Sequence, residues 1–137
     1  MKVRILIFGG LGNQLFQVAF GESLKLSYVN LKIEYIDLTS FYSTKRKWEL
    51  DFLNIYPKKI KKKELYSILI KRLLNKKINK FSPFTLNLSI FKEDQYEYLL
   101  KAIDSKTNFI IDGYWQSEKY FAIHKEQIKK LLNTSYS

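Results

Sequence analysis

The sequence predicts an α/β domain built on a parallel, Rossmann-like sheet. The first observation is the apolar run at residues 3–8, whose branched side chains are typical of a strand buried on both faces. The second is the cluster of Gly9, Gly10 and Gly12, after which the pattern becomes helical. The third is an alternating segment at residues 31–36, which completes a strand–helix–strand unit.

The segment after the glycine cluster repeats its apolar side chains at helical spacing. On a helical projection apolar residues cover most of the surface and leave one narrow polar line, formed by Gln14, Gln17, Gly21 and Lys25. We therefore expect a largely buried helix whose polar line faces a cleft or solvent.

The start of this helix is a candidate binding site. A helix that begins just after a glycine turn offers unpaired N–H groups and the positive end of its dipole to an anion or a sugar oxygen. A plain strand-to-helix turn is the structural alternative. The dinucleotide fingerprint fits poorly because its third glycine would fall at Leu15, although Asp37 is placed to hold a ribose. It also leaves unexplained the amides of Asn13 and Gln14 at the helix mouth.

A third buried strand is predicted at residues 108–112, a compact apolar run that ends before a glycine. We expect it to lie beside the first strand, so that the segments following both strands meet at the carboxyl edge of the sheet, where open parallel sheets bind ligands. Residues 114–117 then project near the loop at residues 10–14.

The remaining segments supply a loop, packing side chains and two more helices. Residues 39–47 are polar and predict a loop, residues 48–55 supply packing side chains, and apolar spacing at residues 96–103 predicts a short helix. Ser117 is placed to cap a final helix. The lone histidine, His124, falls on the apolar stripe of that helix and is expected to pack there rather than to catalyse.

No metal site and no catalytic residue are identified from the sequence. The absence of cysteine removes disulfides and thiolate ligands, and a single histidine makes a zinc site implausible. Together with the lack of a signal-like or membrane-spanning apolar run, this favours a cytoplasmic location.

The net charge of +11 is concentrated at residues 57–80, where ten Lys or Arg oppose Glu64 alone, so that 10 − 1 = +9 lies there. This segment predicts peripheral contact with anionic lipid at the inner membrane or with lipid-linked glycan phosphates. A solvated helix explains the charge equally well. Nucleic acid is disfavoured because arginine clusters and interleaved aromatic residues are lacking.

Two prolines, Pro57 and Pro83, bracket this segment and predict a basic helical insertion at residues 57–83. Its helix is expected to be amphipathic, docked on the sheet or on a membrane. The apolar face comprises Leu65, Tyr66, Leu69, Ile70 and Leu73, and the opposite face comprises Ser67, Lys71 and Asn75.

Three segments together resemble a known family. Residues 9–17, with the sequence GGLGNQLFQ, closely resemble the opening of the bacterial α-1,2-fucosyltransferases, glycosyltransferase family 11. Residues 45–55 look like the second conserved stretch of that family, and residues 112–121 look like the third. The resemblance runs along nearly the whole chain but corresponds to only the first half of a family member.

The resemblance implies transfer of L-fucose from GDP-fucose to the 2-hydroxyl of a galactoside, in surface glycan synthesis, with no metal or cofactor. The partners implied are thus a nucleotide sugar and a galactoside acceptor. The implied architecture is GT-B-like, with two α/β halves facing each other across a cleft. The substrate-binding positions implied by the motifs, together with the turn expected beside them, are Gly10, Gly12, Asn13, Gln14, Tyr114, Gln116 and Ser117.

One motif of the family is missing. Its members bind the nucleotide diphosphate through His-x-Arg-Arg-x-Asp, whereas the three arginines here, Arg4, Arg46 and Arg72, are far apart. We therefore expect residues 1–137 to be an N-terminal α/β domain without the C-terminal GDP-fucose-binding domain. This truncated or partial form is expected to turn over GDP-fucose negligibly on its own. A non-enzymatic membrane-binding module and an NAD-binding oxidoreductase domain remain as alternatives.

Overall fold

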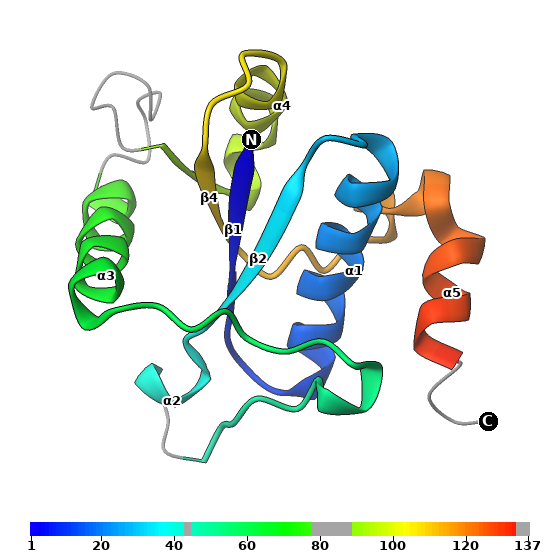
Figure 1. Ribbon diagram of the computed structural model, residues 1–137, viewed down its shortest axis with the longest axis horizontal. Helices are drawn as coiled ribbons and strands as arrows, with labels where there is room; N and C mark the ends of the chain where they lie inside the picture. The colour runs from blue at the N-terminus through cyan, green and yellow to red at the C-terminus, as the bar shows by residue number, and fades with distance from the viewer. Residues whose placement is uncertain (43–44, 78–88, 134–137) are drawn as a thin grey trace.

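A parallel four-stranded sheet forms the centre of the protein, which a computed structural model describes at residues 1–42, 45–77 and 89–133. The strands lie in the order β2-β1-β4-β3, and each neighbouring pair is parallel (Figure 1). Their bounds are Lys2–Ile7 for β1, Lys32–Asp37 for β2, Ile90–Lys92 for β3 and Phe109–Asp112 for β4.

Helices cover both faces of the sheet. The α-helices are α1 (Leu11–Ser27), α2 (Thr39–Tyr42), α3 (Lys62–Lys77), α4 (Tyr96–Asp104) and α5 (Lys125–Asn133). Single 3-10 turns are η1 (Asp51–Leu53), η3 (Glu93–Gln95), η4 (Glu118–Tyr120) and η5 (Ala122–His124). Right-handed crossovers place α1 and α4 on one face and α3 on the other, because β1 to β2 and β3 to β4 step in one direction whereas β2 to β3 steps back.

Two apolar clusters result, one on each face of the sheet. The larger lies under α1 and α4 and joins their side chains to those of β1 and β4, with Phe20, Leu99, Ile111 and Trp115 among its buried members. The smaller lies under α3, where Ile68 packs with Leu6, Ile36 and Ile110. Figure 1 shows α3 on one side of the sheet, whereas α5 lies outside α1 on the other.

The main strand predictions are confirmed. The strands expected at residues 3–8, 31–36 and 108–112 are β1, β2 and β4, and β4 does lie parallel beside β1. The edge strand β3 was not predicted, because three residues are too few to give a periodic pattern. The loop expected at residues 39–47 is wrong at its start, where residues 39–42 form the short helix α2 and the Asp37 carboxylate accepts from the Thr39 amide at 2.9 Å. Residues 43–44 of the predicted loop lie outside the described residues.

The apolar face of α3 was expected to dock on the sheet or on a membrane, and docking on the sheet holds only for part of it. Leu65 and Leu69 pack against the smaller cluster, whereas Tyr66, Ile70 and Leu73 are exposed. Asn75, expected on the opposite face, is fully buried. The physical reason is that Asn75 finds a partner on another element, donating to the Gln95 side chain at 3.1 Å. Residues 78–83 of the predicted insertion lie outside the described residues.

The end of the chain is divided more finely than predicted. Ser117 does cap the next element, accepting from the Lys119 amide at 3.4 Å, but that element is the single turn η4. His124 ends η5 just before α5, and its Nε2 lies 2.8 Å from the Ser27 hydroxyl of α1. Its role is therefore to tie the C-terminal segment to α1.

Candidate functional site

Three loops meet at the carboxyl edge of the sheet, and buried glutamines of α1 hold them together. The Gln17 side chain accepts from the Phe8 amide at the end of β1 and donates to the Gly113 carbonyl after β4, both at 3.1 Å. Gln17 is fully buried. It therefore joins the end of β1 to the loop after β4. Its hydrogen bond to Gly113 connects residues that are 96 positions apart in the sequence.

Gln14 makes the matching connection to the third loop. Its side-chain nitrogen donates to the carbonyls of Gly9 and Lys47, at 3.0 and 2.9 Å, and its oxygen accepts from the Glu49 amide at 3.0 Å. The expectation that the polar line faces a cleft or solvent is thus wrong for Gln14 and Gln17. Gly21 on the same line packs against the Tyr35 ring instead.

The glycines of the loop serve different purposes. Gly9 has φ +83°, and a Cβ there would lie 2.6 Å from the Asn13 side-chain nitrogen. A Cβ at Gly10 would lie 2.7 Å from the guanidinium of Arg46, whereas one at Gly12 would meet open space. The loop therefore packs closely on the protein at Gly9 and Gly10 and faces outward at Gly12.

The first turn of α1 carries uncompensated positive charge. Its N-cap is Gly10, which has no side chain to cap the helix, and the turn contains no acidic residue. The Arg46 guanidinium adds a cation beside this positive end of the helix dipole. Such an arrangement favours an anionic group at the mouth of the helix.

The first turn of α1 and the loop after β4 are joined by two side-chain amides, Asn13 and Gln116, which we call the amide pair. The Gln116 amide nitrogen donates to the Asn13 carbonyl oxygen, and both side chains are at the surface. The predicted proximity of residues 10–14 and 114–117 is therefore present. Each amide retains donor and acceptor capacity for a ligand.

Trp115 is the member of this turn that does not project toward the loop, contrary to the prediction. It is fully buried and stacks on Phe20 of α1, with ring centroids 4.3 Å apart. Its φ of 56° turns it inward, which leaves its neighbours Tyr114 and Gln116 exposed. The buried ring thereby anchors the turn to the larger apolar cluster.

Next to Tyr114 the surface is hollowed. This edge hollow has a volume of about 450 Å³ and lies where β1, β3 and β4 end. It is lined by Phe8, Arg72, Lys92, Glu93, Asp94, Asp112, Gly113 and Tyr114.

The floor of the edge hollow is a buried ion pair. Arg72 of α3 donates to Asp112 at 2.9 Å, and its guanidinium carbon lies 4.5 Å from the centre of the Phe8 ring. The Phe8 ring also contacts the Tyr114 ring edge-on, with the two ring centroids 4.8 Å apart. Glu93 adds a buried carboxylate oxygen that has no hydrogen-bond partner among the described residues.

Sequence reasoning found the glycine loop and the turn after β4 but missed the lining of the hollow. Arg72 lies in the basic segment at residues 57–80 and is the one arginine among its ten basic residues. The charged run Lys92-Glu93-Asp94 directly after two apolar residues was a usable signal of a strand end. Arg46, the second residue of the second motif, lies against the glycine loop at Gly10.

Comparison of the sequence with known proteins finds a similarity to a sugar-transferring enzyme. Over 130 residues the chain is 34% identical to the α-1,2-colitosyltransferase of Escherichia coli. The aligned part covers 90% of this chain and 42% of that protein, so the chain spans less than half the length of this relative. No protein-family model matches the sequence, and no solved structure matches it. The chain is therefore similar, over most of its own length, to part of a glycosyltransferase.

Proposed function

We propose that this chain is the sugar-binding half of a glycosyltransferase of the fucosyltransferase type, with a GT-B-like architecture. The proposed reaction transfers L-fucose from GDP-fucose to the 2-hydroxyl of a galactoside. The observation that carries the proposal is the amide pair of Asn13 and Gln116, which joins the glycine loop to the turn after β4. The similarity to an α-1,2-colitosyltransferase supports the reaction class.

The amide pair suits a sugar because its groups are held at fixed angles. A pyranose presents hydroxyls that both donate and accept, and side-chain amides match both roles. Gln14 and Gln17 keep the underlying loops in place through buried hydrogen bonds. In this proposal Gln14 acts by positioning Asn13 rather than by touching the sugar. Gly12 leaves open space for the sugar, while Gly10 allows the close approach of Arg46.

The edge hollow supplies the rest of a carbohydrate subsite. Tyr114 offers an exposed aromatic ring beside the hollow, and an apolar ring face suits the C–H face of a pyranose. The unpartnered oxygen of Glu93 is suited to accept a hydrogen bond from a sugar hydroxyl. Ser117, two residues beyond the buried ring of Trp115, is committed mainly to capping η4.

The donor is proposed to approach at the mouth of α1. Arg46 and the first-turn amides are the cationic and donor groups that an anionic leaving group requires there. The NAD-binding alternative is less well supported. Asp37 accepts at 2.6 Å from the Thr39 hydroxyl and at 2.9 Å from its amide, so this carboxylate already bonds to a residue of its own loop.

The proposal is tested by titrating the ¹⁵N-labelled 137-residue chain separately with methyl β-galactopyranoside, GDP and NAD while following its side-chain amide signals. We expect the galactoside to shift the signals of Asn13 and Gln116 and to leave those of Gln14 and Gln17 in place. Gln116→Ala should weaken galactoside binding about tenfold, the effect of one lost hydrogen bond.

The matched control is Gln127→Ala, which removes an exposed amide on α5 far from the loop and should leave binding unchanged. Saturable NAD binding with no response to GDP or the galactoside would contradict the proposal and favour the dinucleotide alternative. Equal weakening by the two alanine variants would show that the amide pair has no special role.

A further inference from the structure

We propose that the exposed side of α3 docks on an anionic lipid surface. This outer face of α3 consists of four large apolar side chains on the side away from the sheet: Tyr66, Ile70, Leu73 and Leu74. Their spacing of four, three and one residues places them on one side of a helix. The inference is independent of the proposed sugar chemistry, because none of these residues lines the edge hollow.

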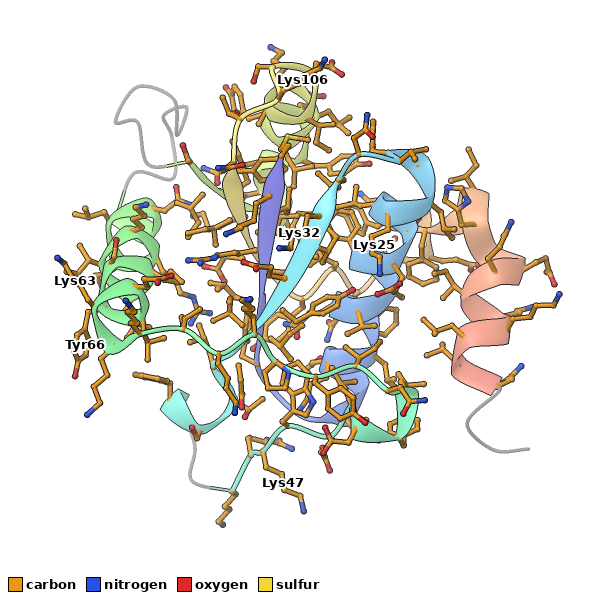
Figure 2. The ribbon with its side chains drawn as sticks, viewed as in Figure 1. Lys25, Lys32, Lys47, Lys63, Tyr66 and Lys106 are labelled. Carbon is orange, nitrogen blue, oxygen red and sulfur yellow. The ribbon has the colours of Figure 1, made fainter. Side chains whose placement is uncertain are left out.

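The exposure of this face is large for side chains of this kind. Tyr66 and Ile70 are each 59% exposed and Leu73 is 57% exposed, whereas Ile68 on the inner side is 2% exposed. Figure 2 shows Tyr66 projecting from the outer side of α3, away from the sheet. Packing against the sheet therefore does not explain why these residues are apolar.

Exposed lysines lie just before α3 and in its first turn. Lys59, Lys61, Lys62 and Lys63 are exposed and make no ion pair with any of the described residues. In Figure 2 Lys63 projects on the same outer side as Tyr66. The acid of the segment, Glu64, does not neutralise them, because it pairs with Arg4 at 2.8 Å.

These lysines lie where a helix favours them least. Lys62 and Lys63 are the first two residues of α3, so their charges add to the positive end of its dipole. Anions placed over them relieve that repulsion. A sheet of lipid phosphates supplies anions beside an apolar layer, which is the combination that the outer face presents.

The helix lies along such a surface rather than across it. No helix in the described ranges is long and apolar enough to cross a bilayer. The 16 residues of α3 extend about 24 Å, with lysine stems that reach headgroup phosphates while the apolar side chains enter the acyl boundary. A second copy of this chain is a poorer occupant of the face, because each copy carries a net charge of +11 and two such chains repel each other. Nucleic acid offers phosphates but no layer that would bury aliphatic side chains.

The test is co-flotation of the 137-residue chain with vesicles of phosphatidylcholine alone or with 30% phosphatidylglycerol. We expect binding to the anionic vesicles, little to the neutral ones, and weakening at high salt. Lys62→Gln with Lys63→Gln should weaken binding by about fivefold for each lysine. Tyr66→Gln with Ile70→Gln and Leu73→Gln should abolish most of the binding that remains at high salt, where the apolar contribution dominates.

The matched control is Lys129→Gln with Lys130→Gln, which removes the same charge from exposed lysines of α5. This variant should bind nearly as the unaltered chain does. Equal loss in the two lysine variants would overturn the proposal, since binding would then follow net charge alone. A dimer in light scattering that the apolar variant dissociates, with no flotation at any lipid composition, would overturn it in favour of a second copy.

Discussion

The helices α1 and α3 have similar lengths, 17 and 16 residues, and pack on opposite faces of one sheet, yet they distribute polarity in opposite ways. In α1 the polar line carries Gln14 and Gln17 into the protein, where both are fully buried. In α3 an apolar stripe containing Tyr66 and Ile70 faces outward. Periodicity identifies the two sides of each helix but does not say which side is buried.

This difference shows that hydrogen-bond partners from distant segments decide which side of each helix faces the protein interior. The buried amides of α1 satisfy backbone groups of three loops that would otherwise be orphaned at the carboxyl edge. The inner side of α3 likewise buries Arg72 and Asn75, which bond to Asp112 and Gln95. Polar residues thus point inward on both helices because they position other elements, and the apolar residues left outside on α3 are available for another surface.

The largest effect is expected at the buried ion pair. Arg72→Met removes the partner of Asp112 and leaves a buried charge uncompensated, which should destabilise the protein by about 3–5 kcal/mol. Urea unfolding of the two proteins measures this. A loss within experimental error would mean that the inner side of α3 is not defined by this pair, and Lys71→Met one residue earlier is the control for a simple loss of charge.

Breaking the connection made by α1 should cost somewhat less. Gln17→Met keeps the volume of the side chain but leaves the Phe8 amide and the Gly113 carbonyl without partners, for an expected loss of about 2–4 kcal/mol. Thermal and urea unfolding measure the loss. Lys25→Met on the same helical line is the control, and it should change stability little because Lys25 is exposed. Similar effects in both variants would contradict the inward orientation of the line.

The contrast within α3 is tested by paired truncations. Ile68→Ala should destabilise the protein by about 2–4 kcal/mol because it opens a cavity against the sheet. Ile70→Ala should change stability by less than about 0.5 kcal/mol, since its side chain is already in solvent. The denaturant midpoints of the two variants measure both losses of stability. A larger loss in Ile70→Ala than in Ile68→Ala would mean that α3 is rotated about its axis.

The smallest effect is a pH dependence at Glu34 of β2. Burial raises the pKa of this carboxyl, but the hydrogen bond from Arg4 and the nearby charges of Lys2 and Lys58 outweigh it and hold the pKa below its ordinary value of 4.5. A carboxyl whose pKa is lower when folded stabilises the protein above its unfolded pKa, and this contribution is lost as the pH falls through the folded pKa.

Glu34→Gln should therefore be less stable than the unaltered protein at neutral pH. The difference should shrink as the pH falls below about 4.5, where the carboxyl of the unaltered chain takes up its proton. Unfolding curves between pH 7 and pH 3 follow it. A difference that stays constant over this range would mean that the ion pairs of Glu34 do not stabilise the fold.

The sequence predicted the parts of the fold that repeat locally. The long apolar runs of β1 and β4 identified strands, and the order of the strands then brought Asn13 near Gln116. The predictions that were wrong concern residues whose partners come close only in the folded chain. Gln14 was expected at the surface because nothing local shows that Lys47 and Glu49 will reach it.

The lining of the edge hollow could not be predicted from the sequence for a related reason. It is formed by side chains from four segments, and Arg72 and Asp112, 40 residues apart, give no sign in the sequence that they pair. Trp115 adjoins the site in sequence but is turned inward by its positive φ, which side-chain composition does not encode. Resemblance to a family located the glycine loop well, but the role of each residue in it required the hydrogen bonds.

The most direct test of the account is hydrogen exchange of four side-chain amides, followed by NMR in the unliganded chain. If α1 turns its polar line inward to hold the loops, the amide protons of Gln14 and Gln17 should exchange at least about 100-fold more slowly than those of Asn13 and Gln116. Exchange of Gln14 and Gln17 at the rate of the two surface amides would contradict it, because the loops of the proposed sugar site would then lack the support on which its geometry depends.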